Sequence, residues 1–135
     1  MSKSAIYMAS ASSSAVAVGE TVPLGSTVRR FGCNAVGNGD AVSLRGAGYY
    51  LVCFNATVAP TAAGTATVSM LRDGQPVQGA SSSVTAGAAG APQTASIAAI
   101  VREFGCACDA SSQIRFELSG ADSMVSGAAV SVVKL

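Results

Sequence analysis

Apolar and polar residues alternate with a period of two along most of this 135-residue chain. In the segment QIRFELS (113–119), Ile114, Phe116 and Leu118 share one face, and polar or charged side chains occupy the other. Such alternation is typical of a strand with one face against a hydrophobic core and the other in water. No segment carries the long i, i+3, i+4 apolar stripe of an amphipathic helix. The sequence therefore predicts an all-β chain with Ile114, Phe116 and Leu118 in its core.

Two further segments are apolar on both faces, namely YYLVCFNATV (49–58) and VSGAAVSVVKL (125–135). A strand that is covered on both faces needs two apolar partners. In a two-sheet sandwich the core supplies one of them, and because no helix is available, the other has to be a second subunit. The candidate residues for this subunit interface are Tyr49, Leu51, Cys53, Val130 and Val132.

Turn signals separate the expected strands at the regular spacing of a β-sandwich or barrel. GNGD (37–40) and RDGQP (72–76) contain Asn-Gly and Asp-Gly, which are the strongest short hairpin signals. The low-complexity stretch 79–99 has two readings, a flexible linker or two strands around a loop. We favour strands at 80–86 and 93–101, because Val84, Ile97 and Val101 provide apolar anchors.

The length predicts a single domain over residues 1–135. Only 11% of the residues are charged and the net charge is +1, against about 25% charged residues in a typical soluble domain. This balance gives no electrostatic footprint for nucleic acid or for an anionic membrane. A surface so rich in Ala, Ser, Thr and Gly is easier to explain if copies of the chain cover it.

The chain contains no apolar run of about 18 residues, so we expect no membrane insertion. The first apolar stretch is interrupted by Ser after a few residues, which does not fit a signal peptide. We therefore expect synthesis in a reducing cytoplasm.

A six-residue motif occurs twice, as VRRFGC (28–33) and VREFGC (101–106). The flanking residues do not match, which argues against a duplicated domain. We interpret each copy as a strand end, in which Phe31 and Phe104 join the core. The following Gly bends the backbone, and the Cys is buried as a small apolar group.

Three interpretations are possible for the four cysteines, which are Cys33, Cys53, Cys106 and Cys108. They are buried thiols, or Cys33 lies near Cys106 or Cys108 and can oxidise, or all four bind a metal. The CAC spacing differs from the C-x₂₋₄-C pair of most zinc sites. We expect thiols, and we predict neither a metal nor a cofactor.

Catalysis has little support in the sequence. There is no His, which removes the commonest general base and metal ligand. The seven acids are scattered, and the glycines form no phosphate-binding loop. Arg29, Arg30 and Arg102 allow either a small anion site or a solvated strand edge that discourages aggregation. We expect a protein that is not an enzyme.

Three segments resemble the tumour necrosis factor-like jelly roll, which is shared with the globular heads of complement proteins. GAGYYLVCFNATV (46–58) resembles the central strand of this family, LRDGQPVQGA (71–80) its hairpin, and VSVVKL (130–135) its terminal strand. The pattern is most similar to the globular tip of collagen-like spore-coat glycoproteins, and to short stand-alone versions from gut Firmicutes and their phages. The resemblance implies a ten-stranded, two-sheet jelly roll that forms a compact homotrimer, with its inner sheet facing the three-fold axis.

Members of this family serve as non-enzymatic tips, adhesins and receptor ligands. The expected function is therefore that of a structural homotrimer on a phage virion surface, as a head decoration, a head fibre or a tail-fibre tip. The alternative is a glycan- or receptor-binding adhesin on a bacterial or spore surface. Expected partners are further copies of the chain, other virion or surface proteins, and in the alternative a glycan or cell-surface receptor.

Overall fold

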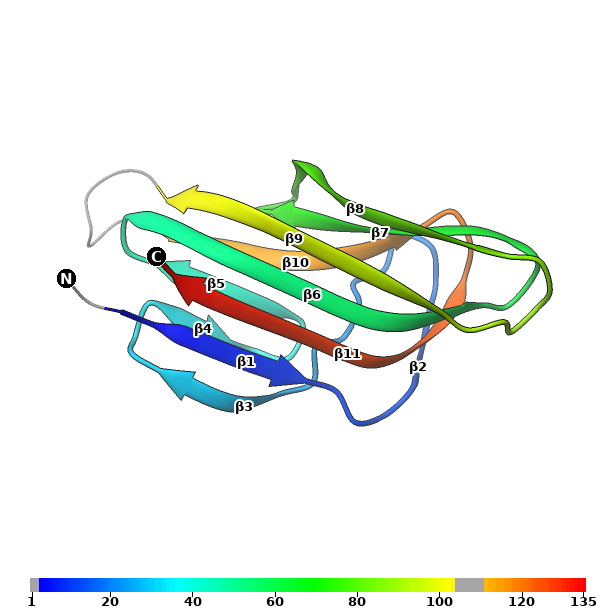
Figure 1. Ribbon diagram of the computed structural model, residues 1–135, viewed down its shortest axis with the longest axis horizontal. Coiled ribbons are helices and arrows are strands. Elements are labelled where there is room, and N and C mark those ends of the chain that lie inside the picture. Colours follow the sequence, from blue (N-terminus) through cyan, green and yellow to red (C-terminus); the bar gives the residue numbers. More distant parts are fainter. Residues whose placement is uncertain (1–2, 104–110) are drawn as a thin grey trace.

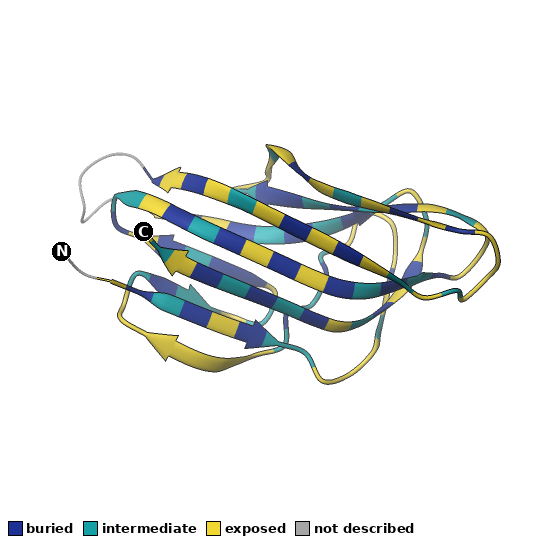
Figure 2. Cartoon of the chain, in the orientation of Figure 1, coloured by how far each residue is buried: buried dark blue, intermediate teal, exposed yellow. Residues whose placement is uncertain are grey.

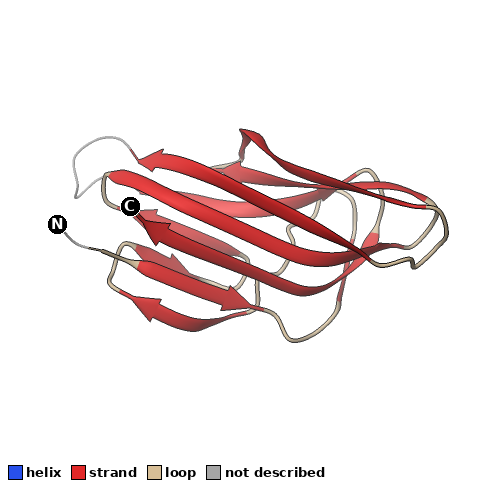
Figure 3. Cartoon of the chain, in the orientation of Figure 1, coloured by secondary structure: helices blue, strands red, loops and turns tan. Residues whose placement is uncertain are grey.

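The computed structural model describes residues 3–103 and 111–135, and these residues form strands, turns and loops without a helix (Figure 3). Strands make up most of the described chain. Their bounds are β1 Ala5–Ala9, β2 Ser14–Val16, β3 Ser26–Phe31, β4 Ala35–Gly37, β5 Ala41–Arg45, β6 Gly48–Pro60, β7 Gly64–Arg72, β8 Gln75–Ala86, β9 Gln93–Glu103, β10 Ser111–Ser119 and β11 Ser123–Lys134. The prediction of an all-β chain is confirmed.

The strands form two antiparallel sheets that pack face to face (Figure 1). The first sheet has the order β3-β1-β11-β6-β9, and β2 pairs with β11 beside this path. The second sheet has the order β4-β5-β10-β7-β8. The terminal strands β1 and β11 lie side by side, as the jelly-roll arrangement requires. The described residues hold eleven strands where the family resemblance implies ten.

The core lies between the two sheets and is built mainly by alternation along β6, β7, β10 and β11 (Figure 2). Ile114, Phe116 and Leu118 on β10 are all 0% exposed, which confirms the prediction for this strand. The ring of Phe116 stacks on that of Phe54 from the opposite sheet, with a centroid distance of 4.1 Å. Each fully buried side chain of this size stabilises the fold by about 1.5–3 kcal/mol. Arg115 and Glu117 on the outer face of β10 are half-buried, where we expected both to be exposed.

Both hairpin predictions are confirmed. Asp73 and Gly74 join β7 to β8, and both have positive φ (50° and 83°), as a two-residue hairpin turn of the primed type requires. GNGD connects the antiparallel pair β4 and β5. The stretch 79–99 lies in β8, β9 and the short loop between them, so it is not a linker. Within the described residues, no helix is long and apolar enough to cross a membrane.

Candidate interaction surface

The outward face of the first sheet carries an apolar row that crosses all five strands of the main path. Strand register places Phe31 opposite Ala5, Ala5 opposite Val133, Val133 opposite Leu51, and Leu51 opposite Ile100. We call these five residues the apolar row. Tyr49 and Leu135 extend the apolar surface at one end, and Tyr7 lies beside the row on β1.

The large side chains of this face lie in solvent. Phe31 is 67% exposed, Ile100 60%, Tyr49 50% and Val133 42%. Along β6, buried residues alternate with exposed or half-buried ones, and most of β9 follows the same pattern (Figure 2). A contiguous apolar patch of this kind on a single chain marks an interaction site.

Three of the predicted interface residues lie on this outward face. Tyr49 and Cys53 are exposed and Leu51 is half-buried, all on β6. The prediction for Val130 and Val132 is wrong, because both are 0% exposed and lie in the core. They pair with Phe54 and Val52, which also face inward. The terminal segment is apolar on both faces, so its own pattern could not identify the outward residues. Only its register with β6 assigns that role to Ser131 and Val133.

The prediction that Phe31 is a core residue is also wrong. It ends the edge strand β3, all six residues of which are exposed. Its cross-strand partner Ala5 belongs to the outward row, so the pleat directs Phe31 away from the second sheet. The bend after Phe31 is present, since Gly32 has φ +78°. Phe104 lies outside the described residues.

The cysteines within the described ranges do not behave as buried thiols. Cys33 and Cys53 are both exposed and both free, which contradicts the expectation for these two. Cys106 and Cys108 lie outside the described residues, so their part in a disulfide or a metal site stays a prediction. Among the described residues, no group of three His, Cys, Asp or Glu side chains could hold a metal ion.

The three arginines that we considered as an anion site are divided between two edges of the sheet. Arg29 and Arg30 are on β3, whereas Arg102 is on β9 at the opposite edge. The guanidinium carbon of Arg102 lies 5.6 Å from the centre of the Tyr49 ring, in a cation–π arrangement. Arg30 Nε donates a hydrogen bond of 3.1 Å to the Ala35 carbonyl. The sequence identified these arginines, but it could not predict that they lie at opposite edges of the sheet, because that depends on the strand order.

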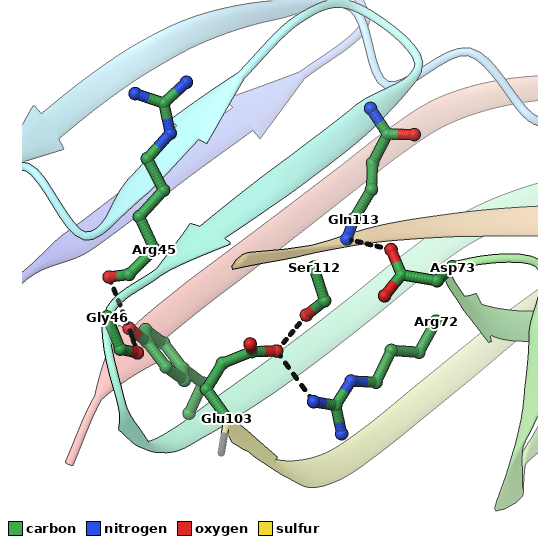
Figure 4. Close-up of polar contacts among 8 residues, drawn as sticks. Arg45, Gly46, Arg72, Asp73, Glu103, Ser112 and Gln113 are labelled. Carbon is green, nitrogen blue, oxygen red and sulfur yellow. Dashed lines mark hydrogen bonds and ion pairs between the residues drawn. The ribbon is translucent and has the colours of Figure 1, made fainter. Parts of the chain in front are cut away.

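A polar cluster lies between the sheets at the end of β9 (Figure 4). The Glu103 side chain is 3% exposed and accepts hydrogen bonds from Arg72 at 2.9 Å and from the Ser112 hydroxyl. The nearby Tyr50 hydroxyl lies 2.8 Å from the Gly46 carbonyl and 2.9 Å from that of Arg45. Burial, followed by the charge of Glu103, raises the pKa of Tyr50. Because Glu103 is enclosed and satisfied by two donors, this cluster joins the sheets and offers no open site for chemistry.

No known protein-family model matches the chain, and no curated protein sequence matches it. Solved structures, however, share its fold over nearly its whole length. Murine APRIL superposes with a TM-score of 0.73 at 16% identity, covering 99% of this chain and 100% of that one. The globular domain of zebrafish complement 1qA gives 0.70 at 10% identity, covering 99% and 98%. The PRD1 vertex protein P5 gives 0.55 at 14% identity, covering 98% and 73%. The fold is therefore the jelly roll of the tumour necrosis factor and complement globular-head type.

Proposed function

We propose that this chain is a non-enzymatic structural module that assembles as a homotrimer and is displayed on the surface of a phage virion. The observation that carries the proposal is the exposed apolar row on the outward face of the first sheet. We propose that a second copy of the chain covers this row and removes it from water. The small number of charged residues fits a surface that is covered in this way.

The part of the row over β11, β6 and β9 is the proposed subunit interface. Val133, Leu51 and Ile100 lie side by side there, and Tyr49 borders them. Burial of each of these side chains contributes up to about 1.5–3 kcal/mol per copy. The small residues Ala129 and Ser131 on β11 allow a neighbouring copy to approach closely. This is the inner sheet that the family resemblance directs toward a three-fold axis.

Virion display rests on a different kind of support. The PRD1 vertex protein P5 is a phage vertex protein, and the chain shares its fold over 98% of its own length. A jelly roll without an evident catalytic cluster in its described residues fits a decoration, a head fibre or a tail-fibre tip. Genes for capsid and tail proteins beside its own gene would support this location, and a neighbourhood of spore or cell-wall genes would contradict it.

Light scattering of the purified protein tests the assembly, and the expected mass at micromolar concentration is that of three chains. Ile100→Lys places a charge in the proposed interface and should give monomers that remain folded, because Ile100 is 60% exposed in the single chain. Val18→Lys is the matched control, since Val18 is 51% exposed and lies in the loop between β2 and β3, outside the apolar row. A monomeric wild-type protein, or a trimeric Ile100→Lys variant, would contradict the proposal.

Thiol labelling provides an independent test of which face is covered. In a variant with Cys106 and Cys108 replaced by Ser, the remaining cysteines are Cys33 and Cys53, and both are exposed in the single chain. A trimer through the proposed interface covers Cys53 and leaves Cys33 open. We expect fast labelling of Cys33 and slow labelling of Cys53, with equal rates in the Ile100→Lys variant.

The second candidate function is a glycan- or receptor-binding adhesin on a bacterial or spore surface. It is favoured by the exposed aromatic side chains of Tyr7, Phe31 and Tyr49, because exposed aromatics commonly anchor ligands. Binding of the protein to intact host cells, in the absence of any virion, would favour this function over a purely structural one.

A further inference from the structure

The β3 edge of the outward face contains a hollow of about 520 Å³. It lies beside the proposed interface and shares Val133 and Ser131 with it. Strand register explains its shape. The small side chain of Ala5 lies between Phe31 and Val133, and Ser131 lies opposite Tyr7. The small residues form the floor, and the larger side chains form the walls. The volume is within the range of about 300–1,000 Å³ that is usual for small-molecule sites.

Two neighbouring rows give the hollow two chemically different halves. One is the beginning of the apolar row, with Phe31, Ala5 and Val133. The next row along the strands consists of Arg29, Tyr7 and Ser131, which present a guanidinium and two hydroxyl groups. Because alternate residues on a strand are about 6.6 Å apart, a ligand a few carbon atoms long reaches from one row to the other.

The charges around the hollow have one sign. Arg29 and Arg30 both line it, but they differ in direction. Arg30 pairs with the buried Ile6 and its Nε donates to the Ala35 carbonyl on β4, so the guanidinium on the outward face is that of Arg29. Within the described ranges, no Asp or Glu lines the hollow. The described acids lie in loops and turns (Glu20, Asp40, Asp73, Asp122), on the second sheet (Glu117) or in the buried cluster (Glu103). Covering the Arg29 guanidinium with an apolar surface that carries no acid is costly. The occupant should therefore bring its own negative charge.

We infer that this hollow binds a small amphiphilic anion, with an apolar body against Phe31 and Val133 and one carboxylate, sulfate or sulfonate group over Arg29, Tyr7 and Ser131. An inorganic anion would leave the apolar half exposed to water. A neutral apolar molecule would leave the Arg29 guanidinium without a counter-charge. The anionic amphiphile satisfies both halves at once.

The probe for this site is 8-anilinonaphthalene-1-sulfonate, and the matched neutral probe is N-phenyl-1-naphthylamine, which has the same rings without the sulfonate. Fluorescence titration of the wild-type protein should give saturable binding of the sulfonate with one site per chain. Arg29→Gln should weaken this binding at least about tenfold, since hydrogen bonds to charged groups are the strong ones. Phe31→Ala should weaken both probes. Arg45→Gln, on the second sheet, is the control and should change neither.

Sulfonate binding that does not saturate, or that is unchanged in Arg29→Gln, would overturn the inference. So would equal affinity of the two probes for the wild-type protein. Light scattering of the same samples separates this result from the proposed function. A trimer that does not bind the sulfonate refutes the hollow alone, whereas a monomer that binds it with the expected Arg29 dependence refutes only the trimer.

Discussion

Nη2 of Arg72, on the second sheet, donates a hydrogen bond of 2.9 Å to Oε1 of Glu103, on the first sheet (Figure 4). The two partners differ in their access to water, because the Glu103 side chain is 3% exposed and that of Arg72 is 28% exposed. Ser112 on β10 donates a further hydrogen bond to the same carboxylate oxygen. The pair therefore ties β7 and β10 to the end of β9, where the two sheets have to be held together.

This unequal exposure predicts unequal effects of removing each partner. Arg72→Ala leaves a carboxylate buried with Ser112 as its donor, and should lower the free energy of unfolding by about 3–5 kcal/mol. Glu103→Gln leaves Arg72 able to reach water, and should cost about 1–2 kcal/mol. Urea unfolding of the two variants measures the difference. Equal losses would mean that the pair shares its burial evenly, contrary to the structure.

Replacement of the core phenylalanine should lower the stability far more than replacement of the surface phenylalanine. Phe116→Ala removes a fully buried ring that stacks on Phe54, and should cost about 3–5 kcal/mol. Phe31→Ala, at 67% exposure, should change the stability of the single chain by less than about 0.5 kcal/mol. Both are measured by urea unfolding in the Ile100→Lys background, so that assembly does not contribute. A large loss from Phe31→Ala would return this residue to the core.

The difference between these two phenylalanines shows what the sequence could predict. Phe116 lies in a strand with strict alternation, so its neighbours alone indicate which way it faces. Phe31 lies in an edge strand next to two arginines, and its direction depends on pairing with Ala5, which is 26 positions earlier in the chain. Such non-local pairing leaves no local pattern to read.

The sequence likewise predicted one part of the candidate surface and not another. The doubly apolar pattern of 49–58 correctly indicated an outward apolar face with Tyr49, Leu51 and Cys53. The pattern of 125–135 could not separate Val132 from Val133, because both faces are apolar there. The sequence did not predict the role of Ile100 or the hollow beside Arg29, because both depend on the register that aligns residues from five strands.

Tyr50 should make stability decrease at high pH. Its raised pKa means that the folded chain keeps the hydroxyl proton above pH 10, where an unfolded tyrosine loses it. Above pH 10 the unfolded state then binds fewer protons than the folded state. The contribution of Tyr50 to the free energy of unfolding is therefore fully present below pH 10, and it is lost as the pH rises through the folded pKa. Comparison of wild type with Tyr50→Phe by urea unfolding from pH 8 to pH 12 should show a steeper fall for wild type. The added slope is at most about 1.4 kcal/mol per pH unit.

Gly32 explains why the motif VRRFGC ends as it does. Its φ of +78° favours glycine, and a Cβ atom there would lie 2.5 Å from the carbonyl oxygen of Lys3 and close to the Ser4 hydroxyl. Gly19 has a similar φ of +88°, but a Cβ atom at that position would have no other atom within 4 Å. Gly19→Ala should therefore cost only the conformational penalty of about 1–2 kcal/mol. Gly32→Ala should cost about 1–3 kcal/mol more, because the backbone of the first residues has to move. If urea unfolding gives equal losses for the two variants, the close approach of residues 3 and 4 to this turn is not what requires glycine, and the motif reflects backbone conformation alone.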